Sequence, residues 1–274
     1  MATESIARQP QRTARHAKQA PGTVAVLLIA ALLLVGPGVS AVAWSAVLEG
    51  PHILELTARA LGPMAALQVN QKLIVYPQTA DAFPSVFDET ATYVMPDRFR
   101  ADTLFELNQR IHLEVGDRSL TLVDGRRTAE ADPFDRYQRL LRSRNRARLM
   151  RTVNQLGVET AISSLGRIAG TVVFVIGARY PDESVSQLAV DKQTFLPTRL
   201  LLVDRDAAAQ PHRLEIFYHD WRKVQSGWFP FQVVFVVDDH LTREIRVAAL
   251  RLNPSLPADY LDMEALKASV ATDP

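Results

Sequence analysis

The chain has 274 residues, of which 47% are hydrophobic and 22% are charged, the composition of a globular protein with a sizeable core. Its 31 Lys and Arg residues nearly balance 30 Asp and Glu residues, and a formal net charge of +1 argues against nucleic-acid binding through bulk positive charge. Cysteine is absent, which excludes disulfides, thiolate zinc sites, iron–sulfur clusters and a cysteine nucleophile.

The N-terminal segment has the order of a secretory signal. Basic residues up to Lys18 precede an uncharged apolar run, Val24 to Val35, which Pro37 follows, and Ala41 and Ala43 form an A-x-A pattern. This order predicts a signal peptide over residues 1–43, cleaved after Ala43, and a protein located in the periplasm. The alternative is an uncleaved inner-membrane anchor, although the run is shorter than the ~20 residues that span a bilayer.

Residues 44–274 are predicted to form a single domain that begins with a helix. Apolar residues at helical spacing predict this helix over His52 to Leu61, and Gly62 ends it. A second, central helix is predicted from Asp132 to about Leu156. Alternating apolar and polar residues predict short strands between the two helices, at Leu67 to Tyr76, Phe87 to Met95, Arg98 to Phe105, Arg110 to Val115 and Ser119 to Val123.

The alternation returns after the central helix. It predicts strands at Val158 to Leu165, Thr171 to Tyr180, Ser186 to Asp191, Thr198 to Val203, His212 to Trp221, Pro230 to Val237 and Thr242 to Leu252. About eleven short strands with two helices indicate a mainly β (α+β) fold, an open, incomplete antiparallel β-barrel.

No catalytic motif is recognisable. The chain lacks G-x-S-x-G, H-E-x-x-H, G-x-x-x-x-G-K-[ST] and G-x-G-x-x-G, and its histidines are scattered. Asp238, Asp239 and His240 could be an acid–base or metal group of a hydrolase, but they lie where two apolar strands must turn, and paired aspartates are ordinary in turns. We therefore expect no enzyme activity, no catalytic residue, no metal and no cofactor.

The central helix carries an unusual density of arginines alongside an apolar side. One interpretation is a basic amphipathic helix that covers an apolar cavity and touches anionic lipid headgroups, giving transient contact with a membrane surface. The other is a solvated helix whose arginine stems cover apolar surface. The candidate headgroup contacts are Arg100, Arg136 and Arg139.

Large apolar side chains recur at alternate positions of the strands, and two helices can cover only part of such a surface. An open barrel can leave a dry cleft for an acyl chain, whereas the alternative is that these side chains pack against the helices. The candidate cavity residues are Leu67, Val69, Leu73, Tyr93, Phe99, Leu113, Phe134, Leu141, Phe174, Ile176, Ile216, Tyr218, Val233 and Phe235.

Several short motifs resemble the periplasmic outer-membrane lipoprotein-sorting, or LolA-like, superfamily. The first is an aromatic residue followed by Pro-x-x-Phe-Arg, from Tyr93 to Arg100. Further similar pieces occur in order at Val123 to Arg126, Val158 to Arg167, Asp191 to Pro197, Tyr218 to Lys223, Gly227 to Pro230 and Asn253 to Pro257.

This resemblance implies an incomplete barrel with helices as a lid over a cavity that holds acyl chains. It implies a carrier that shields the acyl chains of a lipoprotein or another lipid in transit toward the outer membrane, with an inner-membrane transporter and an outer-membrane acceptor as partners. Related folds also serve as envelope-stress regulators of the RseB kind, so a lipid- or lipoprotein-sensing module is the alternative.

Overall fold

The computed structural model describes residues 47–79, 82–128, 132–205 and 211–270. The predicted signal peptide and its cleavage after Ala43 lie outside the described residues. Among the residues described, no helix is long and apolar enough to cross a membrane.

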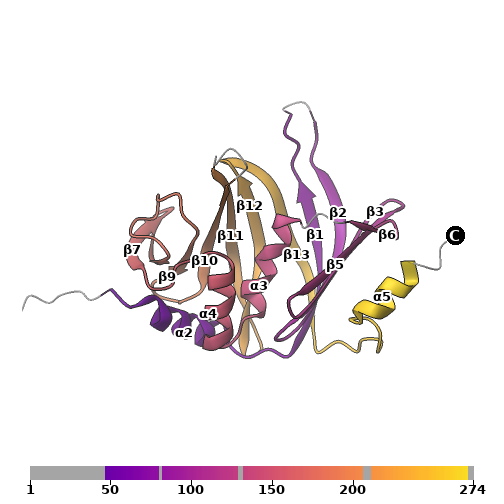
Figure 1. The fold of residues 1–274 in the computed structure, drawn as a ribbon, viewed down its shortest axis with the longest axis horizontal. Coiled ribbons are helices and arrows are strands. Elements are labelled where there is room, and N and C mark those ends of the chain that lie inside the picture. Colours follow the sequence, from indigo (N-terminus) through magenta and orange to yellow (C-terminus); the bar gives the residue numbers. More distant parts are fainter. Residues whose placement is uncertain (1–46, 80–81, 129–131, 206–210, 271–274) are drawn as a thin grey trace, which may run out of the picture. The chain divides into compact units, whose positions relative to one another are not determined.

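All strands of the described part belong to one antiparallel sheet of 13 strands (Figure 1). Their order across the sheet is β6-β5-β4-β3-β2-β1-β13-β12-β11-β10-β9-β8-β7. The bounds are β1 Ala66–Val75, β2 Ser85–Val94, β3 Arg98–Phe105, β4 Asn108–Val115, β5 Arg118–Val123, β6 Arg126–Thr128, β7 Ser163–Ile168, β8 Thr171–Ile176, β9 Gln187–Asp191, β10 Pro197–Arg205, β11 Pro211–Val224, β12 Gly227–Val237 and β13 His240–Leu252.

This topology confirms the predicted fold class, an open antiparallel barrel with few helices. Strands that are consecutive in the chain are neighbours, except that β1 pairs with β13 and that β6 and β7 lie at opposite edges of the sheet. The segment that joins β6 to β7 therefore has to pass from one edge to the other. This segment contains the central helices, so one continuous stretch of the chain covers much of one face of the sheet.

Three element predictions were wrong in detail. The strand expected to run to Tyr180 ends at Ile176, just before Gly177, which has a φ of 98°. The strand expected from Val158 begins only at Ser163, because the residues before it form turns after the helix. The helix expected from Asp132 to Leu156 is broken into a 3-10 turn η1 (Pro133–Arg136) and two helices, α3 (Tyr137–Arg142) and α4 (Arg146–Gln155). The side chain of Asn145 accepts a hydrogen bond from the amide of Arg148 at 3.0 Å and so caps a new helix start.

The N-terminal helix α2 (Gly50–Leu61) was predicted to within two residues at its start. It ends at Gly62, which has a φ of 71° and lies against the β11–β12 turn, where a Cβ atom would come within 2.2 Å of the carbonyl oxygen of Ser226. This close approach places the C-terminal end of α2 beside the start of β12.

We call the face of the sheet covered by α2, α3 and α4 the inner face, and the other the outer face (Figure 1). The main hydrophobic cluster lies between the inner face and these helices. A smaller cluster lies on the outer face, where Met263 and Leu266 of an unpredicted helix, α5 (Met263–Val270), pack against Leu113, Leu120 and Leu122.

Candidate functional site

The inner face brings together nearly all the apolar residues expected from the sequence to line a cavity. Leu113 is not among them, because it points to the outer face, and its neighbours His112 and Glu114 point inward instead. The residues that lie in the main cluster or pack against it are Leu67, Val69, Leu73, Tyr93, Phe99, Phe134, Leu141, Phe174, Ile176, Ile216, Tyr218, Val233 and Phe235.

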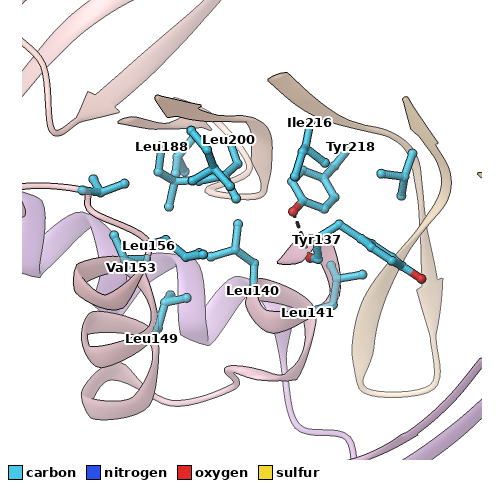
Figure 2. Packing of buried hydrophobic residues seen from close by; sticks show 14 of the residues in the cluster. Tyr137, Leu140, Leu141, Leu149, Val153, Leu156, Leu188, Leu200, Ile216 and Tyr218 are labelled. Atoms are coloured by element: carbon cyan, nitrogen blue, oxygen red, sulfur yellow. Dashed lines mark hydrogen bonds between the residues drawn. The ribbon is translucent and has the colours of Figure 1, made fainter. Parts of the chain in front are cut away.

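The inner face is filled, not hollow. Leu140 and Leu141 of α3, with Leu149 and Val153 of α4, belong to the main cluster between the helices and the strands (Figure 2), and all four are fully buried. The space left among Phe99, Phe134, Tyr137 and Phe235 measures about 20 Å³, room for about one water molecule and far too little for an acyl chain. The cavity that the sequence predicted is therefore occupied in this structure by the side chains of the helices themselves.

A buried polar group, which we call the polar seat, lies beneath α3 on the inner face. Its members are Gln71, Glu89, Tyr93, Thr103 and Tyr137. The carboxylate of Glu89 accepts hydrogen bonds from the Gln71 amide and the Thr103 hydroxyl, both at 2.6 Å. The Tyr137 hydroxyl accepts from the Tyr93 hydroxyl at 3.2 Å and from the Gln71 amide at 3.4 Å.

The tyrosines of this region remain neutral at ordinary pH. Burial raises the pKa of Tyr93, Tyr137 and Tyr218 above the usual value of a phenol. Each hydroxyl therefore keeps its proton and can donate it in a hydrogen bond. Tyr218 donates to the backbone carbonyl of Tyr137 at 3.0 Å, the contact drawn in Figure 2, and so ties α3 to β11.

Glu114 anchors the end of α3 by charge. Its carboxylate contacts Arg142 at 2.5 Å and Arg139 at 3.2 Å, and its side chain is only 4% exposed. Burial on its own would raise the pKa of Glu114, but His112 at 3.5 Å and the two guanidinium groups outweigh burial and lower the pKa to about 2. The carboxylate is therefore ionised at any pH at which the protein would work.

Further ion pairs join the segment before α3 to the sheet. Asp135 contacts Arg110 of β4 at 2.5 Å, and Asp132 contacts Arg243 of β13 at 2.8 Å. On the surface Arg136 pairs with Asp204 of β10 at 2.9 Å. The bend after α3 is held by Arg144, whose guanidinium donates to three backbone carbonyls, those of Leu141, Leu61 and Trp228, at 2.6 to 3.0 Å.

The arginines proposed from the sequence as headgroup contacts do not lie together. Arg100 is on the outer face, where it pairs with Asp102 at 2.7 Å and lies over the ring of Tyr260. Arg136 and Arg139 both belong to the segment that covers the inner face, and Arg139 is 40% exposed. The structure thus brings two of the three to one place.

The alternative hydrolase group forms an exposed hairpin turn between β12 and β13. Asp238 and Asp239 have positive φ angles, and Asp238 accepts a hydrogen bond from the backbone amide of Arg213 at 2.9 Å, which lowers its pKa. The His240 ring contacts the backbone carbonyl of Asp238 at 2.7 Å and not its carboxylate. In the part of the chain that the structure describes, no group of three His, Asp or Glu residues is placed to hold a metal ion.

Sequence reasoning missed the polar seat and the Glu114 anchor. The signal that could have found them is polar residues at inward positions of strands, such as Gln71 between Val69 and Leu73, or Glu89 two residues before Ala91. Polar residues at such positions are easily passed over, because their apolar neighbours alone define the inward side of the strand.

The described part of the chain is thus an open antiparallel barrel whose inner face is covered by the segment that joins its two edges. No protein-family model matches the sequence, and comparison with curated proteins finds no match. Solved structures do match.

A domain from Vibrio parahaemolyticus described as outer-membrane lipoprotein-sorting has 11% identity and a TM-score of 0.52, over 80% of this chain and 98% of that one. A LolA superfamily protein from Nitrosomonas europaea has 11% identity and a TM-score of 0.52, over 79% and 99%. A DUF1329 family protein from Desulfovibrio piger has 12% identity and a TM-score of 0.50, over 78% and 98%. The chain therefore has the LolA-like fold, which confirms the resemblance seen in its motifs as far as the fold is concerned.

Proposed function

We propose that this protein is a non-catalytic periplasmic carrier that holds the acyl chains of a lipoprotein or another lipid against its inner face. The observation that carries the proposal is the identity of the segment that now covers that face. Tyr137, Leu140 and Leu141 belong to a segment that makes no strand pairing, and they occupy the apolar surface that an acyl chain would occupy. In the proposed loaded state, α3 leaves this surface and the chain replaces it.

The free energies of this exchange are of comparable size. Exposing three large apolar side chains costs roughly 1.5–3 kcal/mol each, or about 5–9 kcal/mol in all. An acyl chain that buries about 12 methylene groups gains about 10 kcal/mol at ~0.8 kcal/mol per group. A long chain can therefore displace α3, whereas a short one cannot. The closed form in this structure is then the unloaded state, with its apolar surface protected from water.

The test is to lock α3 in place. Arg136 and Asp204 form an exposed ion pair between the α3 segment and β10, and the natural chain has no cysteine. In R136C/D204C, a short reducible bis-methanethiosulfonate cross-linker joins the two introduced thiols. We expect cross-linking to abolish binding of a fluorescent C16 fatty acid and reduction to restore it.

The matched control is K72C/D88C, which replaces another exposed ion pair, here between β1 and β2. Cross-linking this pair staples two strands that are already neighbours and leaves α3 unrestrained, so binding should persist. If the locked R136C/D204C protein binds the fatty acid as tightly as the reduced protein does, α3 is not the lid. If no form of the protein binds it, the carrier proposal fails.

A carrier and a sensor differ in the fate of the bound ligand. A carrier releases its cargo to an acceptor, so fluorescent fatty acid loaded on the protein should move to added phospholipid vesicles faster than it dissociates into buffer. A lipid-sensing module of the cell envelope would retain its ligand in the presence of vesicles. Retention would therefore favour the sensor over the carrier while leaving acyl binding intact.

A further inference from the structure

A cavity with polar walls lies beside the C-terminal end of α3, next to Glu114 on the inner face. Its volume is about 300 Å³, and it lies between the helices and the turns at Pro96 and Gly116. The helix α4 contributes Arg148, Thr152 and Gln155 at spacings of four and three, which places them on one side of that helix. The remaining lining residues are Glu114, Asp117, Arg139, Arg142 and Ser143.

Three guanidinium groups converge on this cavity with fewer negative charges to balance them. Arg139 and Arg142 share one carboxylate, that of Glu114. Asp117 is the other acidic residue of the lining and lies in an exposed turn. Burial, together with the positive charges of Arg139 and Arg148, lowers the pKa of Arg142 even though Glu114 is beside it. The site therefore has positive charge that its own residues leave partly unbalanced.

Arg142 also has donors without acceptors. Its side chain is 6% exposed, and only its Nη2 atom reaches Glu114. The Nε and Nη1 atoms are buried and have no hydrogen-bond partner in the described part of the chain. A buried guanidinium with unsatisfied donors is rare, because each unmade hydrogen bond is costly. A small shift of this side chain toward an anion in the cavity would give these donors an acceptor.

We propose that this cavity is a binding site for a phosphate group, formed by Arg139, Arg142 and Arg148. A guanidinium presents paired N–H donors that match two oxygens of a tetrahedral oxyanion, and three such groups around one cavity supply enough donors for all of its oxygens. The cavity is also larger than a single water molecule needs. The group can come from free phosphate or from a phospholipid headgroup, since both present the same oxygens.

The test of this site does not depend on the proposed acyl binding, because inorganic phosphate carries no acyl chain and would bind the closed form, in which Arg139 and Arg142 of α3 line the cavity. The first measurement is titration calorimetry of the whole protein with inorganic phosphate at fixed ionic strength, with acetate as the comparison anion. We expect saturable binding of phosphate that acetate does not reproduce. In Arg148→Gln the affinity should fall about tenfold or more, since one charged donor set is lost.

The matched control is Arg151→Gln, which removes the same charge from an exposed position of α4 that does not line the cavity. Its phosphate affinity should stay at the level of the unmodified protein. Arg148 is partly exposed, so Arg148→Gln is expected to fold, and circular dichroism checks this. Equal weakening by both substitutions would show attraction to net charge instead of a site, and would overturn the proposal.

The second measurement separates the two sources of phosphate, using flotation of the protein with phosphatidylglycerol vesicles and with vesicles of a phosphate-free galactolipid. Binding only to phosphatidylglycerol, lost in Arg148→Gln and competed by inorganic phosphate, supports a headgroup as the ligand. Saturable phosphate binding without vesicle binding supports free phosphate. The absence of both overturns the proposal, and it does so whether or not the protein carries acyl chains.

Discussion

Truncating a fully buried residue of α3 should increase ligand affinity while it lowers stability. Leu140 is 0% exposed and packs, with Leu188 and Leu200, between α3 and the strands (Figure 2). In Leu140→Ala the closed form loses roughly 2–5 kcal/mol, from lost transfer free energy and from the cavity that remains. In the open form the same side chain is in water, so the truncation costs little there.

The difference shifts the balance between the closed and open forms. Each 1.4 kcal/mol changes the ratio tenfold, so a loss of 2 kcal/mol raises the apparent affinity for a C16 fatty acid about 30-fold. The apparent affinity rises as the closed form is destabilised, until the open form predominates. Beyond that point it stays at the intrinsic affinity of the open form. Fluorescence titration gives the affinity, and urea unfolding of the same samples gives the free energy of unfolding.

Leu113→Ala is the matched control, because Leu113 is an equally buried leucine on the outer face, packed under α5. It should lose stability of the same order and show no gain in affinity. If Leu140→Ala loses stability while its affinity stays unchanged or falls, α3 is an ordinary part of the core. The proposed exchange between α3 and an acyl chain would then be wrong.

Three further results are expected. Tyr137→Phe removes a hydroxyl that accepts two hydrogen bonds in the polar seat, so it should destabilise the closed form by about 1–3 kcal/mol and let shorter fatty acids bind in a chain-length series. The pKa of Glu114 is lowered to about 2 from 4.5, so its ionised carboxylate stabilises the fold by an amount of order 3 kcal/mol above pH 4.5. This contribution is lost as the pH falls toward 2. In urea unfolding at several pH values, the free energy of unfolding of Glu114→Gln should therefore depend less on pH in this range. Gly62 has a φ of 71° and lies close to the backbone of the β11–β12 turn, so Gly62→Ala strains the backbone and also meets this turn. It should lower the free energy of unfolding by more than about 1 kcal/mol, measured by urea unfolding.

Most strands could be located in the sequence because the period of two is strong in several of them and turn residues bound them. In β1, for example, the apolar residues Leu67, Val69 and Leu73 share one face and alternate with polar residues. The short strand β6, with two arginines in three residues, has no such pattern and was missed. Its pairing with β5 depends on the turn at Asp124 and Gly125, which brings it alongside regardless of its own preference.

The break in the central helix could have been predicted from the sequence, but only by giving one residue more weight. Asn145 is a favoured N-cap residue, yet it stands within a run of good helix formers, and a continuous helical pattern was the simpler interpretation. In the structure the bend places Arg144 so that its guanidinium donates to backbone carbonyls of α2 and β12, and these contacts stabilise the break in the helix. Such tertiary contacts have no local signature.

The filled inner face could not be predicted from the sequence, because alternation shows which side of a strand is apolar but not what covers it. The same limit placed Leu113 wrongly. In β4 the apolar residues Ile111, Leu113 and Val115 alternate with His112 and Glu114, but this apolar side faces α5 on the outer face. The register with the neighbouring strand β3 shows which face each residue of β4 occupies. Phe99 pairs with Glu114, so Glu114 and not Leu113 shares the inner face with the aromatic cluster.

The polar seat explains why a lid could be both closed at rest and removable. The apolar contacts of α3 are of the kind that an acyl chain makes, so their exchange changes the free energy little. The hydrogen bonds of Tyr137 and the ion pairs of Glu114 are contacts that a hydrocarbon cannot replace, and they bias the protein toward the closed form. If breaking them costs about 4 kcal/mol, about five extra methylene groups are needed to offset it at ~0.8 kcal/mol each. In the proposed carrier, the polar seat and Glu114 would thus set the shortest acyl chain that can displace α3, which purely apolar contacts could not do.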